Sequence, residues 1–133
     1  MTLRSNLDIV REFIDAFNRG DVEGFVAYTA EDVEMVEAPE YPGATSRHGH
    51  AGVRETLASW SQVWGRLTTT MDEMIEVDEE RVLTLGRQRA RGGSGGVEIE
   101  AFVAALYRIR EGRVVSMHFF LDEAQARAAA GLG

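Results

Sequence analysis

Hydrophobic residues recur at helical spacing in two stretches of the chain. In the first, the apolar positions that share one side of a helix are Leu7, Val10, Phe13, Ile14 and Phe17. Asn6 is suited to cap this helix and Gly20 to end it, and Asp21 can cap a second, short helix that runs through Tyr28. In the second stretch one face is formed by Val53, Leu57, Trp60, Ser61 and Trp64. His50 can cap that helix and Gly65 ends it, so the pattern predicts three helices in the first half of the chain.

Alternation between apolar and polar positions marks the strands. It predicts a short strand at residues 33–37, and longer strands at 67–77, 82–91, 97–110 and 113–121. Turns are expected at 78–81 and 111–112. Loops are expected at 38–49, which holds both prolines, and at 92–96, where the glycines lack the Lys-Ser/Thr and the helix of a phosphate-binding loop. With a short terminal helix at 124–130, the order of elements predicts an α+β fold.

Composition narrows the class of protein. The chain has 133 residues, which fits one domain over residues 1–133, and 44 % of them are hydrophobic, enough for a packed core. The net charge of −8 argues against nucleic acid as a partner. No apolar run is long enough to span a bilayer, and the first residues lack a signal-peptide pattern, so we expect a soluble cytoplasmic protein with no membrane partner. The absence of cysteine excludes disulfides and thiol nucleophiles.

Three segments carry a family resemblance. They are Phe-Asn-Arg-Gly-Asp at 17–21, Arg-His-Gly-His-Ala-Gly-Val-Arg at 47–54, and the closing hairpin at 106–122. In this order and at this length they resemble the SnoaL-like branch of the NTF2-like superfamily, which includes ketosteroid isomerase-like and polyketide cyclase-like folds. The resemblance implies a cone-shaped α+β barrel, in which about three N-terminal helices pack on a curved, mostly antiparallel sheet and enclose an apolar pocket.

Ketosteroid isomerases of this superfamily use an acid on the strand after the second helix as a base. A tyrosine on the first helix and an acid on the penultimate strand form their oxyanion hole. By resemblance, the base falls on Glu37, the tyrosine on Phe13, and the second acid on Ala105, or on Ala104 if the turn is aligned without a gap. Because both oxyanion donors are missing, steroid-isomerase-like enolisation is not expected.

Two other reactions of the superfamily also lack their residues. The polyketide cyclase pattern has an acid on the final strand and a histidine two residues earlier, and these positions fall on Phe119 and Met117. The Asp-Arg-Asp constellation of limonene epoxide hydrolases has no counterpart that we can place. The resemblance therefore implies a pocket rather than a particular reaction.

Glu37 is the leading candidate for catalysis, and His48 is a second one. Strand alternation puts Val33, Met35 and Glu37 on one face, so a carboxylate among apolar groups is expected if that face lines the pocket. Desolvation would raise the pKa of such a carboxyl, which suits proton transfer. The alternatives are a solvated Glu37 at the strand end, and a surface His48 beside a capping His50. No metal site is expected, because a third ligand and an H-E-x-x-H helix are absent.

The pocket is expected to be apolar, with Tyr28 and Tyr107 as its phenol donors. The alternative for most of the candidates is simple core packing. The expected ligand-binding residues are Phe13, Phe17, Tyr28, Met35, Trp60, Trp64, Val103, Ala105, Tyr107, Met117 and Phe119.

The outer face of the sheet carries two further expectations. Parity places His118 on this face, opposite to Met117 and Phe119, and the resemblance implies a homodimer there. Residues Arg87, Arg89, Arg91, Glu98 and Glu100 suit a cross-strand ladder of opposite charges. We favour this solvated ladder over the alternative, an anion site for a carboxylated or phosphorylated ligand.

The sequence thus supports two functions. The first is a protein that binds a small hydrophobic molecule and catalyses cofactor-free proton transfer, as an isomerase, cyclase, dehydratase or epoxide hydrolase, with Glu37 as acid or base. The second is a non-catalytic ligand-binding or scaffold homodimer of the same fold. Neither needs an organic cofactor.

Overall fold

The computed structural model describes residues 5–41, 44–91 and 98–132. Its helices are α1 (Asn6–Asn18), α2 (Val22–Ala27), α3 (Gly49–Trp64) and α4 (Glu123–Ala129). Its strands are β1 (Thr29–Val36), β2 (Ser46–His48), β3 (Arg66–Glu76), β4 (Arg81–Arg91), β5 (Glu98–Arg110) and β6 (Arg113–Phe120). The predicted α+β class is confirmed. The predicted glycine-rich loop at 92–96 lies outside the described residues.

The strands form one sheet in the order β2-β1-β6-β5-β4-β3. All neighbouring pairs are antiparallel except β1 and β6, which are parallel. The three long strands β3, β4 and β5 follow one another as hairpins, whereas β1 joins the sheet beside the last strand. This pairing brings the N-terminal half of the chain against its C-terminal strand, as the cone of the predicted fold requires.

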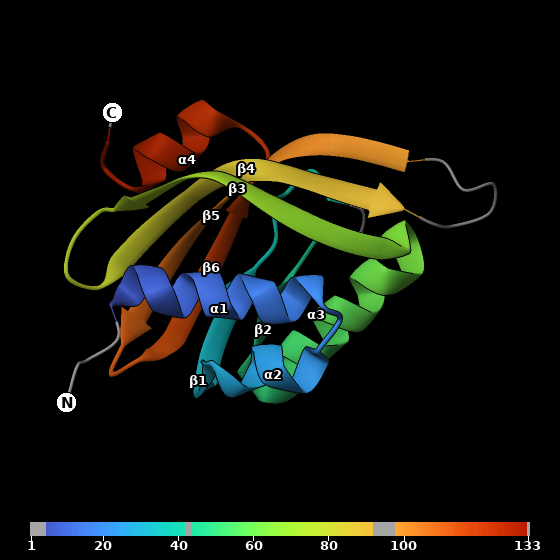
Figure 1. Cartoon of the computed structure of the whole chain (residues 1–133), viewed down its shortest axis with the longest axis horizontal. Coiled ribbons are helices and arrows are strands. Elements are labelled where there is room, and N and C mark those ends of the chain that lie inside the picture. The colour runs from blue at the N-terminus through green and yellow to red at the C-terminus, as the bar shows by residue number, and fades with distance from the viewer. Residues whose placement is uncertain (1–4, 42–43, 92–97, 133) are drawn as a thin grey trace.

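The sheet curves around the first three helices (Figure 1). Helix α1 lies across the concave side of the sheet, with α2 and α3 beside it, whereas α4 lies on the opposite side, near β4 and β5 (Figure 1). The space between the concave side and helices α1–α3 is therefore where a pocket is expected.

Local sequence explains most of the element ends, with three corrections. Ser5 rather than Asn6 caps α1, since its side chain accepts a bond from the Asp8 amide. His50 does not cap α3: it lies inside the first turn, and its Nε2 is 3.1 Å from the Thr29 carbonyl oxygen. The predicted loop at 38–49 contains the short strand β2, which pairs with β1. Asp21 caps α2 as predicted, by accepting a bond from the Gly24 amide.

A bulge interrupts the pairing of β3 with β4, and a glycine on β4 lies where the two strands approach closely. The register of β3 against β4 shifts between Met71 and Glu73. A Cβ atom on Gly86, the partner of Met71, would lie 2.0 Å from the Thr70 carbonyl oxygen. Only a residue without a side chain fits at this close approach, so Gly86 permits the contact between the two strands at the bulge.

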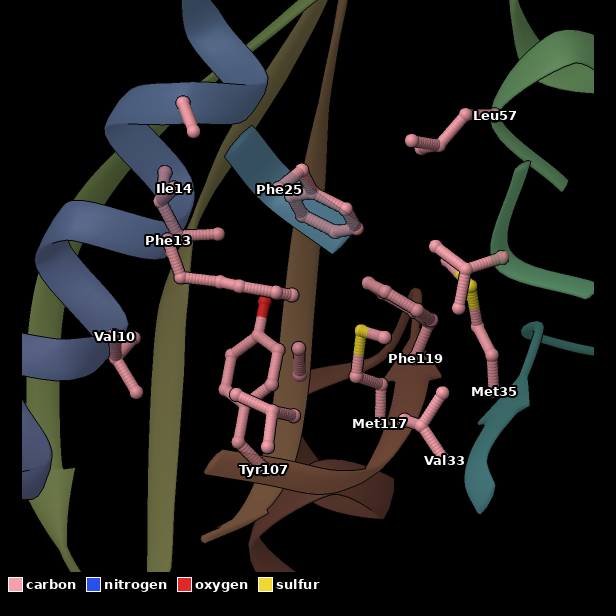
Figure 2. Close-up of a cluster of buried hydrophobic side chains, with 14 of the residues drawn as sticks. Val10, Phe13, Ile14, Phe25, Val33, Met35, Leu57, Tyr107, Met117 and Phe119 are labelled. Atoms are coloured by element: carbon pink, nitrogen blue, oxygen red, sulfur yellow. The ribbon is translucent and has the colours of Figure 1, made fainter. Parts of the chain in front are cut away.

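Aromatic side chains fill the concave side. The rings of Phe13 and Phe25 stack with centroids 3.9 Å apart, and Phe13 meets the edge of Tyr107 at 5.8 Å. Figure 2 shows side chains of α1, α2, α3, β1, β5 and β6 converging in this cluster, with Met117 and Phe119 pointing in from the sheet. The inward placement of Met117 and Phe119 agrees with the predicted strand parity.

The convex side of the sheet divides into a covered centre and charged ends. Ala126 and Ala130 of the C-terminal segment pack on Leu83, Leu85 and Ala104, which face away from the main core. At one end, a ladder of opposite charges follows the strands as predicted, with ion pairs Arg87–Glu100, Arg89–Glu98 and Arg89–Glu100. Helix α4 therefore covers the middle of the face through which we expect a homodimer. Within the described residues, no helix is long and apolar enough to cross a membrane.

Candidate functional site

An open cleft lies where α1, α2, α3 and the start of β3 meet. Its volume is about 490 Å³, within the range of small-molecule sites. Aromatic and aliphatic side chains make up much of its wall, and a few polar groups border it. Its lining residues are Phe17, Asn18, Gly20, Asp21, Val22, Phe25, Leu57, Trp60, Ser61, Gly65, Arg66 and Leu67.

A second, much smaller hollow lies deeper in the cone. Its volume is about 20 Å³, enough for one water molecule and too small for an organic ligand. It shares the side chains of Phe17, Phe25 and Trp60 with the open cleft, so these three rings form a wall common to both spaces. Its other lining residues are Ile14, Thr69, Met71, Thr84, Gly86, Gln88, Val103, Ala104, Ala105, Tyr107 and Phe119.

Asn18 fixes the rim of the cleft. Its side-chain amide donates to the Thr69 carbonyl oxygen at 2.9 Å, and its Oδ1 accepts from the Thr69 amide at 2.8 Å. This pair of bonds ties the C-terminus of α1 to β3, as a neighbouring strand would. Arg66, at the start of β3, donates to the Asn18 carbonyl oxygen at 3.3 Å. The rim is therefore a fixed frame, with a guanidinium group at its edge.

The structure distributes the eleven residues expected to bind a ligand over three places. Phe17 and Trp60 line both spaces. The inner hollow alone is lined by Val103, Ala105, Tyr107 and Phe119. The remaining five residues line neither space: Phe13, Tyr28, Met35, Trp64 and Met117. Three of these, Phe13, Met35 and Met117, are fully buried in the core.

Glu37 is held behind Trp60. It follows β1 directly and is 6 % exposed. Its Oε1 accepts a hydrogen bond from Trp60 Nε1 at 2.5 Å, and its Oε2 accepts one from the Thr45 amide at 3.0 Å. Glu37 lines neither the cleft nor the hollow. Its carboxylate is thus buried with both oxygens hydrogen-bonded, and the indole of Trp60 is anchored by it.

Two tyrosines near this pair are less acidic than usual. Burial, aided by the negative charges of Glu37 and Glu40, raises the pKa of Tyr41 to about 12. The Tyr41 hydroxyl donates to Gln88 Oε1 at 3.1 Å, and its ring meets the edge of Trp60. Burial also raises the pKa of Tyr107. Both phenols therefore stay protonated at neutral pH and can act as hydrogen-bond donors.

The other predicted polar candidates lie away from the two spaces. His48 is exposed, and its Nε2 lies 3.2 Å from Glu34 on the convex side of the sheet. His118, on the same side as predicted, lies 3.4 Å from the other oxygen of Glu34. Tyr28 donates to Glu12 at 3.2 Å. In the described part of the chain, no group of three or more acidic or histidine side chains is arranged to hold a metal ion.

Sequence reasoning missed several residues of the cleft. Phe25 and Leu57 carried a signal, since both are large apolar residues on predicted helices. Asn18 lies in the 17–21 segment that carries the family resemblance, but nothing in that segment pointed to a cleft. Arg66 carried no signal, because an arginine at a strand start is common on solvated surfaces. Their place at the cleft follows from the packing of α1 on β3, which no local pattern encodes.

A family model described as "SnoaL-like domain" matches residues 10–117. The chain belongs to this family. The match runs from the middle of α1 into β6 and so includes every wall of the cleft. The resemblance seen in the sequence is confirmed, as is its NTF2-like fold.

Solved structures give the same fold. TerC, co-crystallised with polyporic acid, superposes with a TM-score of 0.79 at 23 % identity, covering 95 % of this chain and 98 % of that one. An NTF2-like protein of unknown function from Burkholderia pseudomallei has a TM-score of 0.77 at 25 % identity, with 95 % and 97 % covered. A ketosteroid isomerase-like fold from Catenulispora acidiphila, in complex with trimethylamine, has a TM-score of 0.76 at 14 % identity, with 98 % and 96 % covered. No curated protein matches the chain.

Proposed function

We propose that this SnoaL-like protein binds a small, largely apolar molecule in the open cleft. The observation that carries the proposal is the contrast in volume: the cleft measures about 490 Å³, whereas the hollow inside the cone measures about 20 Å³. A bound molecule would lie against the rings of Phe17 and Trp60, with Leu57 and Leu67 completing an apolar wall. Aromatic walls bury much apolar surface and favour flat ligands.

Relatives of the same fold support a ligand-binding role. TerC was co-crystallised with polyporic acid, and the Catenulispora acidiphila protein was solved in complex with trimethylamine. Both share with this chain the cone built from helices on a curved sheet. Their identities of 23 % and 14 % carry over the fold, so the ligand of this chain is argued from its own cleft.

Proton-transfer catalysis by Glu37 is a second candidate. It is supported by the burial of Glu37, which is the one buried carboxylate among the described residues. A general base must come within hydrogen-bond reach of its substrate. Both Glu37 oxygens are already bonded, and Trp60 is one of the groups they hold. Catalysis would therefore need the indole to swing away, which makes binding the better-supported function. The predicted role of His48 has less support, because His48 pairs with Glu34 on the convex side.

The homodimer remains part of the proposal. Since α4 covers the centre of the convex face, a partner would meet the strip formed by β2, β1 and β6, where Glu34 lies between His48 and His118. Light scattering at micromolar concentration tests this directly, and a monomeric mass would exclude it.

Thermal unfolding with neutral aromatic probes tests the binding function. A ligand that binds the folded chain raises the unfolding midpoint by mass action. We expect naphthalene-sized neutral probes to stabilise the wild type and to lose that effect in Phe17→Ser. Val63→Ser is the matched control, because Val63 is 50 % exposed and lines neither space. Equal stabilisation of both variants would place binding elsewhere, and no stabilisation of the wild type by any probe would refute the proposal.

For the catalytic candidate, Glu37→Gln is the decisive variant. If a substrate of the cleft is turned over by the wild type, the variant should lose that turnover while keeping the binding affinity. Unchanged turnover would remove Glu37 from the mechanism.

A further inference from the structure

Arg66 connects the aromatic cleft to a second, charged hollow. This hollow, of about 200 Å³, lies beside the start of β3 and the end of β4. It is lined by Arg66, Thr68, Arg89, Arg91 and Glu98. Arg66 is also part of the cleft wall, on the same rim as Asn18. A molecule in the cleft therefore has a guanidinium group at its edge.

Arg66 and Arg91 differ from most other arginines of the chain. Arg89, in the same hollow, is ion-paired with Glu98 at 2.9 Å and with Glu100 at 3.0 Å. Across residues 5–41, 44–91 and 98–132, no carboxylate lies within 4.0 Å of Arg66 or Arg91. Among the described arginines, the same holds for Arg113, which donates to the Ala27 carbonyl oxygen and lines neither the cleft nor the charged hollow.

The register of the sheet places these two arginines together. Arg66 and Arg91 are directly opposite partners in the β3–β4 pair. Like charges at opposite positions of a sheet repel each other, so the pair costs free energy unless an anion lies nearby. The one carboxylate in the charged hollow, Glu98, is already paired with Arg89. Glu98 lies opposite Arg91 in the β4–β5 pair, and the cleft wall also includes Asp21, but neither carboxylate lies within 4.0 Å of Arg66. The guanidinium group of Arg66, which donates to the Asn18 carbonyl oxygen, can therefore also meet an external anion.

We propose that the ligand of the cleft is an aromatic acid, whose carboxylate binds Arg66 while its ring lies against Phe17 and Trp60. The inference rests on the proposed binding function and specifies the chemistry of the ligand. The planar guanidinium group matches a carboxylate in two parallel hydrogen bonds. Arg91 adds positive charge at the same rim, and the apolar walls explain why a ring rather than a small inorganic anion fills the cleft.

A matched pair of probes tests this inference: 2-naphthoate and its neutral amide, 2-naphthamide. Both present the same rings, and only one is an anion. We expect the wild type to bind naphthoate about tenfold more tightly than the amide at low salt, as a charge-assisted contact implies. The net charge of the protein would repel an anion, so this preference has to come from a local site. Isothermal titration calorimetry measures both affinities without relying on tryptophan fluorescence.

Variants separate the local site from global charge. Arg66→Gln should abolish the preference, so that the variant binds naphthoate and naphthamide with equal affinity. Arg11→Gln makes the same change in net charge at an exposed position that lines neither space, and it should keep the preference. Equal affinities of the wild type for both probes would overturn the inference and leave the binding function standing. A preference that survives Arg66→Gln would also overturn it. Failure of both probes to bind would count against the inference and against the proposed function.

Discussion

The cleft at the mouth of the cone and the hollow within it are neighbours that share three aromatic rings, yet they differ in what they can hold. The cleft, of about 490 Å³, is open and bordered by Asn18 and Arg66. The hollow, of about 20 Å³, is largely filled by side chains that line it. The difference in volume shows that side chains of the core fill most of the concave side of the sheet. The space that could hold a ligand lies at the rim.

The identity of a few side chains accounts for the filled interior. Phe13 is fully buried and stacks on Phe25, which also lines both spaces. Trp60 reaches from α3 to Glu37 and meets the edge of Phe119 at 5.3 Å. Aromatic rings therefore fill much of the space between the cleft and the deeper residues.

The largest expected effect comes from opening the interior. Phe13→Ala removes a fully buried ring, and we expect the free energy of unfolding to fall by about 3–5 kcal/mol, because a cavity is left in a close-packed region. Leu67→Ala, in the half-buried wall of the cleft, should cost only about 1 kcal/mol. Urea denaturation followed by circular dichroism measures both. If both variants lost the same unfolding free energy, the interior would be packed no better than the cleft wall. The contrast between the cleft and the interior would then be wrong.

A smaller effect is expected at the wall that the two spaces share. Trp60→Phe keeps an aromatic ring but removes the N–H group that Glu37 accepts, so it leaves a buried carboxylate oxygen without that partner. We expect a loss of about 1–3 kcal/mol in the free energy of unfolding. Trp64→Phe is the control: it changes a half-buried tryptophan that lines neither space, and it should cost less.

The double variant Trp60→Phe/Glu37→Gln sharpens this test. Glu37→Gln leaves one side-chain oxygen for two donors, Trp60 Nε1 and the Thr45 amide, so it weakens the bond that Trp60→Phe removes. The combined loss should therefore be smaller than the sum of the single losses. Additive losses would show that Glu37 does not anchor the indole. The position of Trp60 at the shared wall would then need another cause.

Periodicity predicted much of this architecture. Alternation placed Met35 and Glu37 on the inward face of the first strand, and parity separated Met117 and Phe119 from His118, because side chains of a strand alternate between two faces. The strand β2 escaped prediction, since its three residues follow a proline-containing segment and form a strand only through pairing with β1. Short elements of this kind depend on tertiary contacts more than on local propensity.

The site was harder to predict than the fold. That Glu37 would be buried was foreseen as one alternative, but its partner Trp60 lies 23 residues away in sequence, and their contact depends on how α3 packs on β1. The division between core and cleft was equally hidden, because an apolar residue looks the same in sequence whether it fills a core or lines a pocket. Arg66 is a candidate for two reasons that the sequence does not show. Arg91 lies opposite it on the neighbouring strand, and the packing of three helices places a cleft beside it.

The smallest expected effect on stability appears at high pH and concerns Tyr41, which contacts Trp60. The raised pKa of Tyr41, about 12 against an ordinary value of 10.0, means that the folded state holds the phenolic proton more tightly than the unfolded state. Its contribution to stability is therefore fully present below about pH 10 and is lost as the pH rises through about 12. The difference in unfolding free energy between the wild type and Tyr41→Phe, measured at pH 8 and near pH 11.5, should shrink by about 1–2 kcal/mol.

Because the charge of Glu37 contributes to this shift, Glu37→Gln should lower the pKa of Tyr41, as read from phenolate absorbance. A Tyr41 that titrates near its ordinary value would show that water reaches this side of Trp60, and that the interior beside the cleft is less well packed than the comparison requires.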